Sequence, residues 1–150
     1  MQVDKKYTTT SFKQTQKLGE NIAKEVLKLP VQNTALILCL HGNLGGGKTT
    51  FLQGFAKGLG VKEKILSPTF VVMKRFPLHT PNGSFYHFDC YRLKNEKNVL
   101  ELGFKEIISN TKNIIAIEWP EKIKKVLPKT TIKINFKFID ENRREVNFKI

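Results

Sequence analysis

The residues that indicate a chemical role most clearly lie in one short segment, Gly42 to Thr49, which reads GNLGGGKT. It matches the pattern G-x-x-x-x-G-K-[ST], whose backbone N–H groups surround phosphates. Gly45, Gly46 and Gly47 allow positive φ angles and bring the backbone close to phosphate oxygens without a Cβ in the way. The positive end of the following helix adds to this attraction. The segment is therefore predicted to be a nucleotide-binding loop.

The three residues after the last loop glycine supply side-chain chemistry. Lys48 is expected to reach the β- and γ-phosphates, and Thr49 to offer its hydroxyl to Mg²⁺, which prefers oxygen ligands. Thr50 follows them and belongs to the same predicted nucleotide-binding set. A glycine-rich turn without a ligand is the alternative, but a buried strand before the loop and a helix after it favour nucleotide binding.

Two acidic residues follow apolar runs and are candidates for the chemistry of hydrolysis. Hydrolysis requires an acid near Mg²⁺ and a group that places the attacking water. Glu118 ends the run IIAIE, and Asp89 ends SFYHFD. Each could instead be a solvated loop carboxylate or a helix cap. Two such acids in a chain with a phosphate loop favour metal-binding and catalytic roles for both.

Two further groups of polar residues permit more than one interpretation. His87 and Asp89 lie two positions apart, so on a strand they share a face. A zinc site is disfavoured in a chain with three histidines, and hydrogen bonding is the favoured role for His87. The hydroxyls of Ser67 and Thr69 either contact the γ-phosphate or Mg²⁺, as a switch segment does, or begin a turn.

The elements that must position these residues follow from hydrophobic periodicity. Ser11 and Gln14 have the spacing of a capping box at the start of a helix over 11–28, which ends near Pro30. The apolar run 34–40 predicts a strand buried on both faces. Further helices are expected at 48–59 and 95–108, and further strands at 70–76, 85–90, 113–118, 131–139 and 145–150.

This order of elements predicts one α/β domain over residues 1–150. We expect a P-loop NTPase-like mixed sheet whose central buried strand leads into the phosphate loop, with flanking helices and a C-terminal β-hairpin. The N-terminal residues have no apolar stretch of a signal peptide, and no run approaches the ~20 apolar residues that span a bilayer. We expect a cytoplasmic protein without a membrane segment, and buried, reduced thiols at Cys39 and Cys90.

The formal net charge of +13 admits two explanations. Because lysines are spread along most of the chain, a solvated basic surface is favoured. A functional attraction to RNA or to an acidic partner is the alternative.

Five ordered motifs resemble one family. GNLGGGKTTF, SPTF (67–70), YHFDCYRL (86–93), ELGF (101–104) and IEWPE (117–121) occur in the order and spacing of the TsaE family, also called YjeE. Its members are small P-loop ATPases of bacterial tRNA threonylcarbamoyladenosine (t6A) synthesis. The resemblance implies ATP and Mg²⁺ as ligands, slow ATP hydrolysis, and action on the TsaD–TsaB complex, which modifies adenosine 37 of ANN-decoding tRNAs. We expect a monomer or a weak oligomer, and any contact with tRNA is expected to be weak or indirect.

The resemblance also assigns roles to individual residues. Lys48 and Thr49 would hold phosphate and Mg²⁺, Glu118 would coordinate the metal or orient water, Asp89 would serve the same site, and Thr69 would act as the switch residue.

The resemblance implies three further roles, and the sequence departs from the family pattern at one position of the loop. Trp119 would pack beside the site, Thr15 would contact nucleotide from the first helix, and Arg143 would reach it from the last hairpin, although the adjacent Arg144 aligns equally well. The family pattern GDLGAGKT has Asp where this chain has Asn43. The mechanism is therefore expected to depend more on Asp89 and Glu118.

Three rival functions share the phosphate loop. A small-molecule kinase requires an acceptor pocket and an arginine-bearing lid, for which Arg75 and Arg92 are too isolated. A GTPase requires an N-K-x-D motif, which the sequence lacks. An ATP-dependent binding module that hardly turns over overlaps with the behaviour of the family and stays open.

Overall fold

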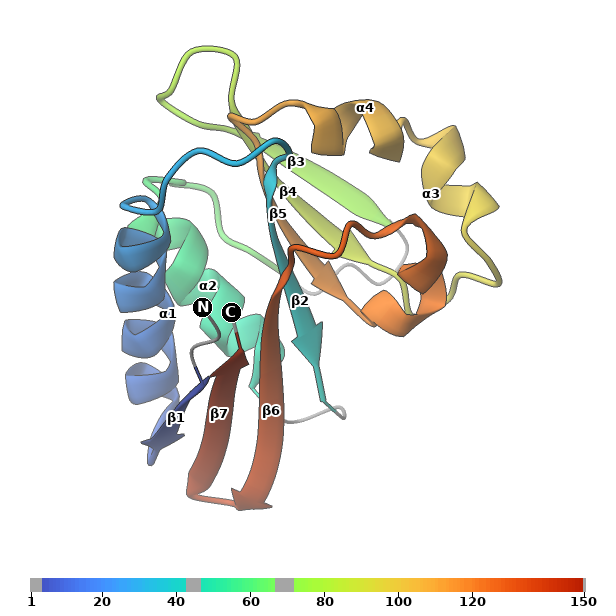
Figure 1. The fold of residues 1–150 in the computed structure, drawn as a ribbon. Helices are drawn as coiled ribbons and strands as arrows, with labels where there is room; N and C mark the ends of the chain where they lie inside the picture. Colours follow the sequence, from blue (N-terminus) through green and yellow to red (C-terminus); the bar gives the residue numbers. More distant parts are fainter. Residues whose placement is uncertain (1–3, 43–46, 67–71, 150) are drawn as a thin grey trace.

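A single mixed sheet runs through the described part of the chain (Figure 1). In this computed structural model the described residues are 4–42, 47–66 and 72–149. The strands are β1 (Asp4–Thr9), β2 (Leu36–His41), β3 (Met73–Pro77), β4 (Ser84–Asp89), β5 (Ile114–Glu118), β6 (Ile132–Asp140) and β7 (Arg143–Lys149). Their order in the sheet is β1-β7-β6-β2-β5-β4-β3, so β2 is the middle strand. The predicted central strand before the loop is confirmed.

Parallel pairing determines which chain segments meet. β2 pairs parallel with β5 on one side and β6 on the other, and β5 pairs parallel with β4. These four strands therefore end at one edge of the sheet, which we call the C-terminal edge. The antiparallel hairpin of β6 and β7 turns at the same edge, and β1 ends there because Thr9 lies opposite Arg144. Residues far apart in sequence thus converge on one region.

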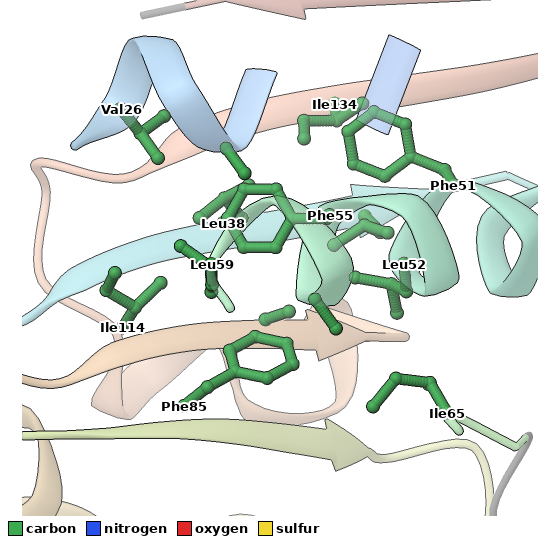
Figure 2. Packing of buried hydrophobic residues seen from close by; sticks show 14 of the residues in the cluster. Val26, Leu38, Phe51, Leu52, Phe55, Leu59, Ile65, Phe85, Ile114 and Ile134 are labelled. Atoms are coloured by element: carbon green, nitrogen blue, oxygen red, sulfur yellow. The ribbon is translucent and has the colours of Figure 1, made fainter. Parts of the chain in front are cut away.

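Helices cover the two faces of the sheet (Figure 1). α1 (Phe12–Val26) and α2 (Lys48–Gly58) lie on one face. α3 (Lys97–Glu101), α4 (Phe104–Ser109) and the 3₁₀ segment η1 (Pro120–Val126) lie on the other. Each face has its own apolar cluster, because alternate residues of the buried strands point to opposite sides. On the α2 side, Phe51, Phe55 and Leu52 pack against the strands (Figure 2).

The start of α1 is capped close to the C-terminal edge. Ser11 Oγ accepts a hydrogen bond from the backbone N–H of Gln14 at 3.1 Å, as predicted. The Gln14 side chain accepts from the backbone N–H of Thr10 at 2.8 Å, one residue earlier than a capping box requires. The cap fixes the first turn of α1, and with it Thr15, directly after strand β1.

Close contact between α1 and α2 depends on glycine. A Cβ at Gly54 would overlap the backbone of Gln16, and one at Gly19 would overlap the carbonyl of Phe51. The two helix backbones therefore touch, which holds α2 and the loop residue at its start against α1.

Most predicted elements are confirmed, with three differences. The predicted helix over 95–108 is two short helices, separated by Gly103 at φ 83°. Strand β1 was not predicted, because an edge strand reading DKKYTT buries few side chains and shows no apolar alternation. The segment η1 was also not predicted.

Cys39 and Cys90 are free and buried as expected, and burial raises the pKa of their thiols to about 11 and about 12. None of the described helices has the length and hydrophobicity required to cross a bilayer.

We predict that Gly54→Ala lowers the free energy of unfolding. Overpacking costs about 1–3 kcal/mol, and here the added methyl meets backbone atoms that cannot rotate away. The helix preference of Ala over Gly, about 1 kcal/mol, offsets only part of this cost. Denaturant unfolding measures the difference. The exposed Lys57→Ala on the same helix is the control and should be nearly neutral; equal stability of the two variants would contradict the account of the helix contact.

Candidate functional site

Three strand ends meet at the middle of the C-terminal edge. β2 ends at His41 and leads into Gly42, β5 ends at Glu118, and β4 ends at Asp89. Asp89 and Glu118 are register partners, as are Glu118 and Leu40. Neighbouring strands lie about 4.8 Å apart, so the two carboxylates begin from adjacent backbones beside the start of the loop.

The described ends of the glycine loop have conformations that require glycine. Gly42 has φ 142°, and a Cβ there would lie 2.5 Å from the carbonyl oxygen of Phe136. Gly47 has φ 95° and is the N-cap of α2, where no side chain caps the helix. A helix N-terminus without a side-chain cap leaves backbone donors for an anion. Gly45, Gly46 and Asn43 lie outside the described residues.

Lys48 is folded inward between the strand ends. It is 5% exposed, and its Nζ donates a 2.6 Å hydrogen bond to the carbonyl of Gly42. The same ammonium lies 4.4 Å from the centre of the Trp119 ring, a cation–π contact. Burial lowers the pKa of Lys48, and the charges of Glu118 and Asp89 oppose that shift. A buried cation is thus held next to two carboxylates.

Glu118 is buried and hydrogen-bonded to a histidine. It is 4% exposed and His87 is 1% exposed, and Glu118 Oε2 lies 2.7 Å from His87 Nε2. The predicted hydrogen-bonding role of His87 is confirmed, and its partner is the acid at the end of the neighbouring strand.

Asp89 is half-buried at the end of β4. Its Oδ1 accepts a hydrogen bond from the backbone N–H of Tyr91 at 3.1 Å. Burial raises the pKa of Asp89, which this hydrogen bond opposes, and the negative charge of Glu118 raises it further. The two acids therefore repel each other, and a cation between them would be stabilised by both.

Trp119 adopts a strained backbone conformation at the site. Its φ of 58° and ψ of 52° lie in the left-handed region, which costs a bulky L-residue about 1–2 kcal/mol. The turn occurs directly after Glu118, and Pro120 then begins η1. The Trp119 ring contacts the Tyr91 ring, and the two ring centroids are 5.0 Å apart. The strain places the indole over Lys48.

The predicted threonines lie close to the end of the loop. Thr15 is 2% exposed, and its hydroxyl lies 2.7 Å from that of Thr9. Its Cγ2 methyl would lie 3.6 Å from a Cβ at Gly47. Thr49 and Thr50 are partly exposed in the first turn of α2. Thr69 lies outside the described residues.

The last hairpin brings Arg144, and not Arg143, to the loop. Arg143 is exposed and forms an ion pair of 2.8 Å with Asp140 at the hairpin turn. The Cγ of Arg144 would lie 3.9 Å from a Cβ at Gly47, and its guanidinium lies 4.5 Å from the centre of the Phe138 ring. Adjacent residues of a strand point to opposite faces, so only one of the two arginines can face the loop.

The donor set at the edge fits one kind of metal. The candidates Thr49, Glu118 and Asp89 offer hydroxyl and carboxylate oxygens, which suit Mg²⁺ and not zinc. Among residues 4–42, 47–66 and 72–149, no group of three His, Cys, Asp or Glu side chains is gathered for a metal ion. Such a site would need oxygens from a phosphate ligand to complete it, as is usual for Mg²⁺.

Two features of the site were not found from the residues. The pairing of His87 with Glu118 depends on the order of the strands in the sheet. The signal in the sequence was that His87 lies on a strand that ends in an acid, Asp89, as the strand of Glu118 also does. The strain at Trp119 was also missed. The sequence carried no signal for it, because the residue before a proline such as Pro120 is ordinarily restricted to extended conformations.

Comparison with known proteins identifies the family. The pattern of the family described as "Threonylcarbamoyl adenosine biosynthesis protein TsaE" matches residues 9–146. A Rickettsia typhi protein named "tRNA threonylcarbamoyladenosine biosynthesis protein TsaE" is 39% identical, covering 87% of this chain and 90% of its own length. A Haemophilus influenzae relative of the same name is 33% identical over 85% of this chain and 78% of its own. The crystal structure of Bacillus subtilis YdiB superposes with a TM-score of 0.74 at 28% identity, covering 99% of this chain and 86% of that one.

These matches extend over nearly all of the chain, including the loop, the two acids and the final hairpin. The fold predicted from the sequence agrees with that of the solved structure. The chain is a member of the TsaE family.

Proposed function

We propose that the protein binds Mg²⁺–ATP at the C-terminal edge and hydrolyses it slowly, as an ATPase of tRNA t6A biosynthesis. One observation supports this most strongly: Lys48, Glu118 and Asp89 meet near Gly42, where β2 leads into the loop, although they come from three separate segments of the chain. A buried cation and two acids next to an uncapped helix N-terminus match what a nucleoside triphosphate and its metal require.

Each residue contributes a different interaction. Lys48 would exchange its bond to the Gly42 carbonyl for phosphate oxygens, and the backbone N–H groups at the start of α2 would bind the same anion. Thr49, Glu118 and Asp89 would hold Mg²⁺, which neutralises charge that develops on the phosphates. Glu118 would also orient the attacking water. Thr15 and Thr50 would border the nucleotide.

The biological role is inferred from the relatives. Their names place them in threonylcarbamoyladenosine biosynthesis of tRNA. We infer that this chain acts there on the TsaD–TsaB complex, that ATP hydrolysis resets that complex, and that turnover is faster in its presence. Any contact of the basic surface with tRNA would be weak or indirect.

Phosphate release measures this role directly. With purified TsaD and TsaB, the steady-state rate should exceed that of the isolated chain. Unchanged turnover in the presence of both partners would contradict the proposed action on the complex, whereas transfer of label from ATP to an added small acceptor would indicate a kinase.

Lys48 and Glu118 should separate binding from hydrolysis. We predict that Lys48→Ala weakens ATP binding at least about 10- to 100-fold, because charge-assisted hydrogen bonds contribute about 1.5–3 kcal/mol each. Glu118→Ala should keep binding and lower turnover by about 10²–10⁴-fold. Equilibrium dialysis with labelled ATP and phosphate release measure the two effects.

A matched lysine on the same helix provides the control for this pair. Lys57 is exposed at the far end of α2, and Lys57→Ala should bind ATP as the wild type does. Normal turnover of Glu118→Ala would move the catalytic role to another residue.

The two adjacent arginines should differ in their effect on nucleotide affinity. Arg144 lies beside Gly47, so Arg144→Ala should weaken ATP binding by about 10-fold, the value of one charged hydrogen bond. Arg143→Ala should leave affinity unchanged, because Arg143 pairs with Asp140 at the turn. Calorimetric titration with ATP compares them. The reverse order of effects would show that the hairpin changes register when nucleotide binds.

A further inference from the structure

One buried contact at the site goes beyond the roles assigned so far. His87 and Glu118 are both almost fully buried, on neighbouring parallel strands. His87 lies opposite Ala116, two residues before Glu118 on β5, so its ring must extend along the strands to reach the acid. The resulting distance of 2.7 Å between Nε2 and Oε2 is that of a strong hydrogen bond.

The chemistry of the two groups fixes the direction of the bond. When Glu118 is ionised, its carboxylate can only accept hydrogen bonds, so His87 Nε2 then carries the proton and donates it. Among the described residues, Glu118 forms this one side-chain hydrogen bond, through Oε2. The other oxygen, Oε1, is therefore left for a metal ion or a water molecule.

We propose that His87 is a positioning residue that holds Glu118 by one oxygen and thereby presents the other to the nucleotide site. The residue opposite His87 is Ala116, whose small side chain takes little space beside the imidazole. Rotation of Glu118 is restricted, so the acid is preorganised before any ligand arrives. Groups that orient a metal-binding carboxylate in this way commonly affect metal affinity and activity by about 10- to 100-fold.

A purely structural role would have a different effect. Removing one partner of a buried polar pair costs stability, because the other partner is left unsatisfied. A loss of stability alone does not change the metal dependence or the turnover of the protein that remains folded. If His87 served packing alone, a leucine would substitute for it without changing metal dependence or turnover. The two roles are therefore separable.

The experiment compares His87→Leu, which has similar bulk and no donor, with His87→Gln, which keeps an N–H donor of similar reach. Each is made in the wild-type chain and in Glu118→Ala, and the exposed His79→Gln is the matched control. Fluorescence of Trp119, the single tryptophan, reports ATP binding with and without Mg²⁺. Phosphate release gives kcat and KM.

We expect His87→Leu to lower kcat by about 10- to 100-fold and to raise the Mg²⁺ concentration that gives half-maximal turnover. The ATP affinity of this variant without metal should stay within about 3-fold of wild type, since Glu118 would contact the metal and not the nucleotide itself. His87→Gln should retain kcat within about 5-fold. In the Glu118→Ala background, His87→Leu should cause no further loss, because the histidine acts through the acid.

Three results would overturn the proposal: wild-type kcat and metal dependence in His87→Leu, an equal loss in a folded His87→Gln, or a further loss from His87→Leu without Glu118. If the leucine variant does not fold, His87→Asn replaces it, since its amide is too short to reach Oε2.

The inference rests on the proposed function, and the same measurements distinguish their failures. A wild-type chain that binds no ATP contradicts the function. Wild-type turnover with an unaffected His87→Leu contradicts the role of His87 alone.

Discussion

The parallel pairing of β2, β5 and β4 is the constraint on which the site depends. It places the ends of three strands side by side, and with them Gly42, Glu118 and Asp89. Pairing also fixes register, and a one-residue shift of β4 or of β5 would turn the acid at the end of that strand to the opposite face of the sheet. The hydrophobic runs that bury these strands on both faces therefore position the polar residues that end them.

The electrostatics of the edge are those of a site prepared for a charged ligand. Two acids and one buried lysine lie within a small region, and burying these groups costs desolvation free energy that contributes little to stability. Strain at Trp119 adds to that cost. Stored strain and unfavourable burial cluster where binding or catalysis offsets them, so both features are consistent with the proposed nucleotide site. The glycine contact between α1 and α2 supplies the rigid support.

The sequence predicted the central strand, the loop and the strand-terminal acids because each is encoded in a short window. Apolar runs identified β2 and β5, and glycine spacing identified the loop. Strand order is not local, so the contact between His87 and Glu118 was not predicted. The choice between Arg143 and Arg144 required the hairpin register, which a two-residue periodicity cannot fix without a neighbouring strand. Strand β1 was not predicted, because an edge strand with polar side chains lacks the alternation of apolar residues that marks a strand facing the core.

The most direct test of the central claim is a crystal structure of the protein with Mg²⁺ and a non-hydrolysable ATP analogue. The account predicts that Lys48 leaves the Gly42 carbonyl for the β- and γ-phosphates, with Mg²⁺ held near Thr49, Glu118 and Asp89. A nucleotide bound away from the C-terminal edge, or Lys48 still bonded to Gly42 beside the bound phosphates, would contradict it.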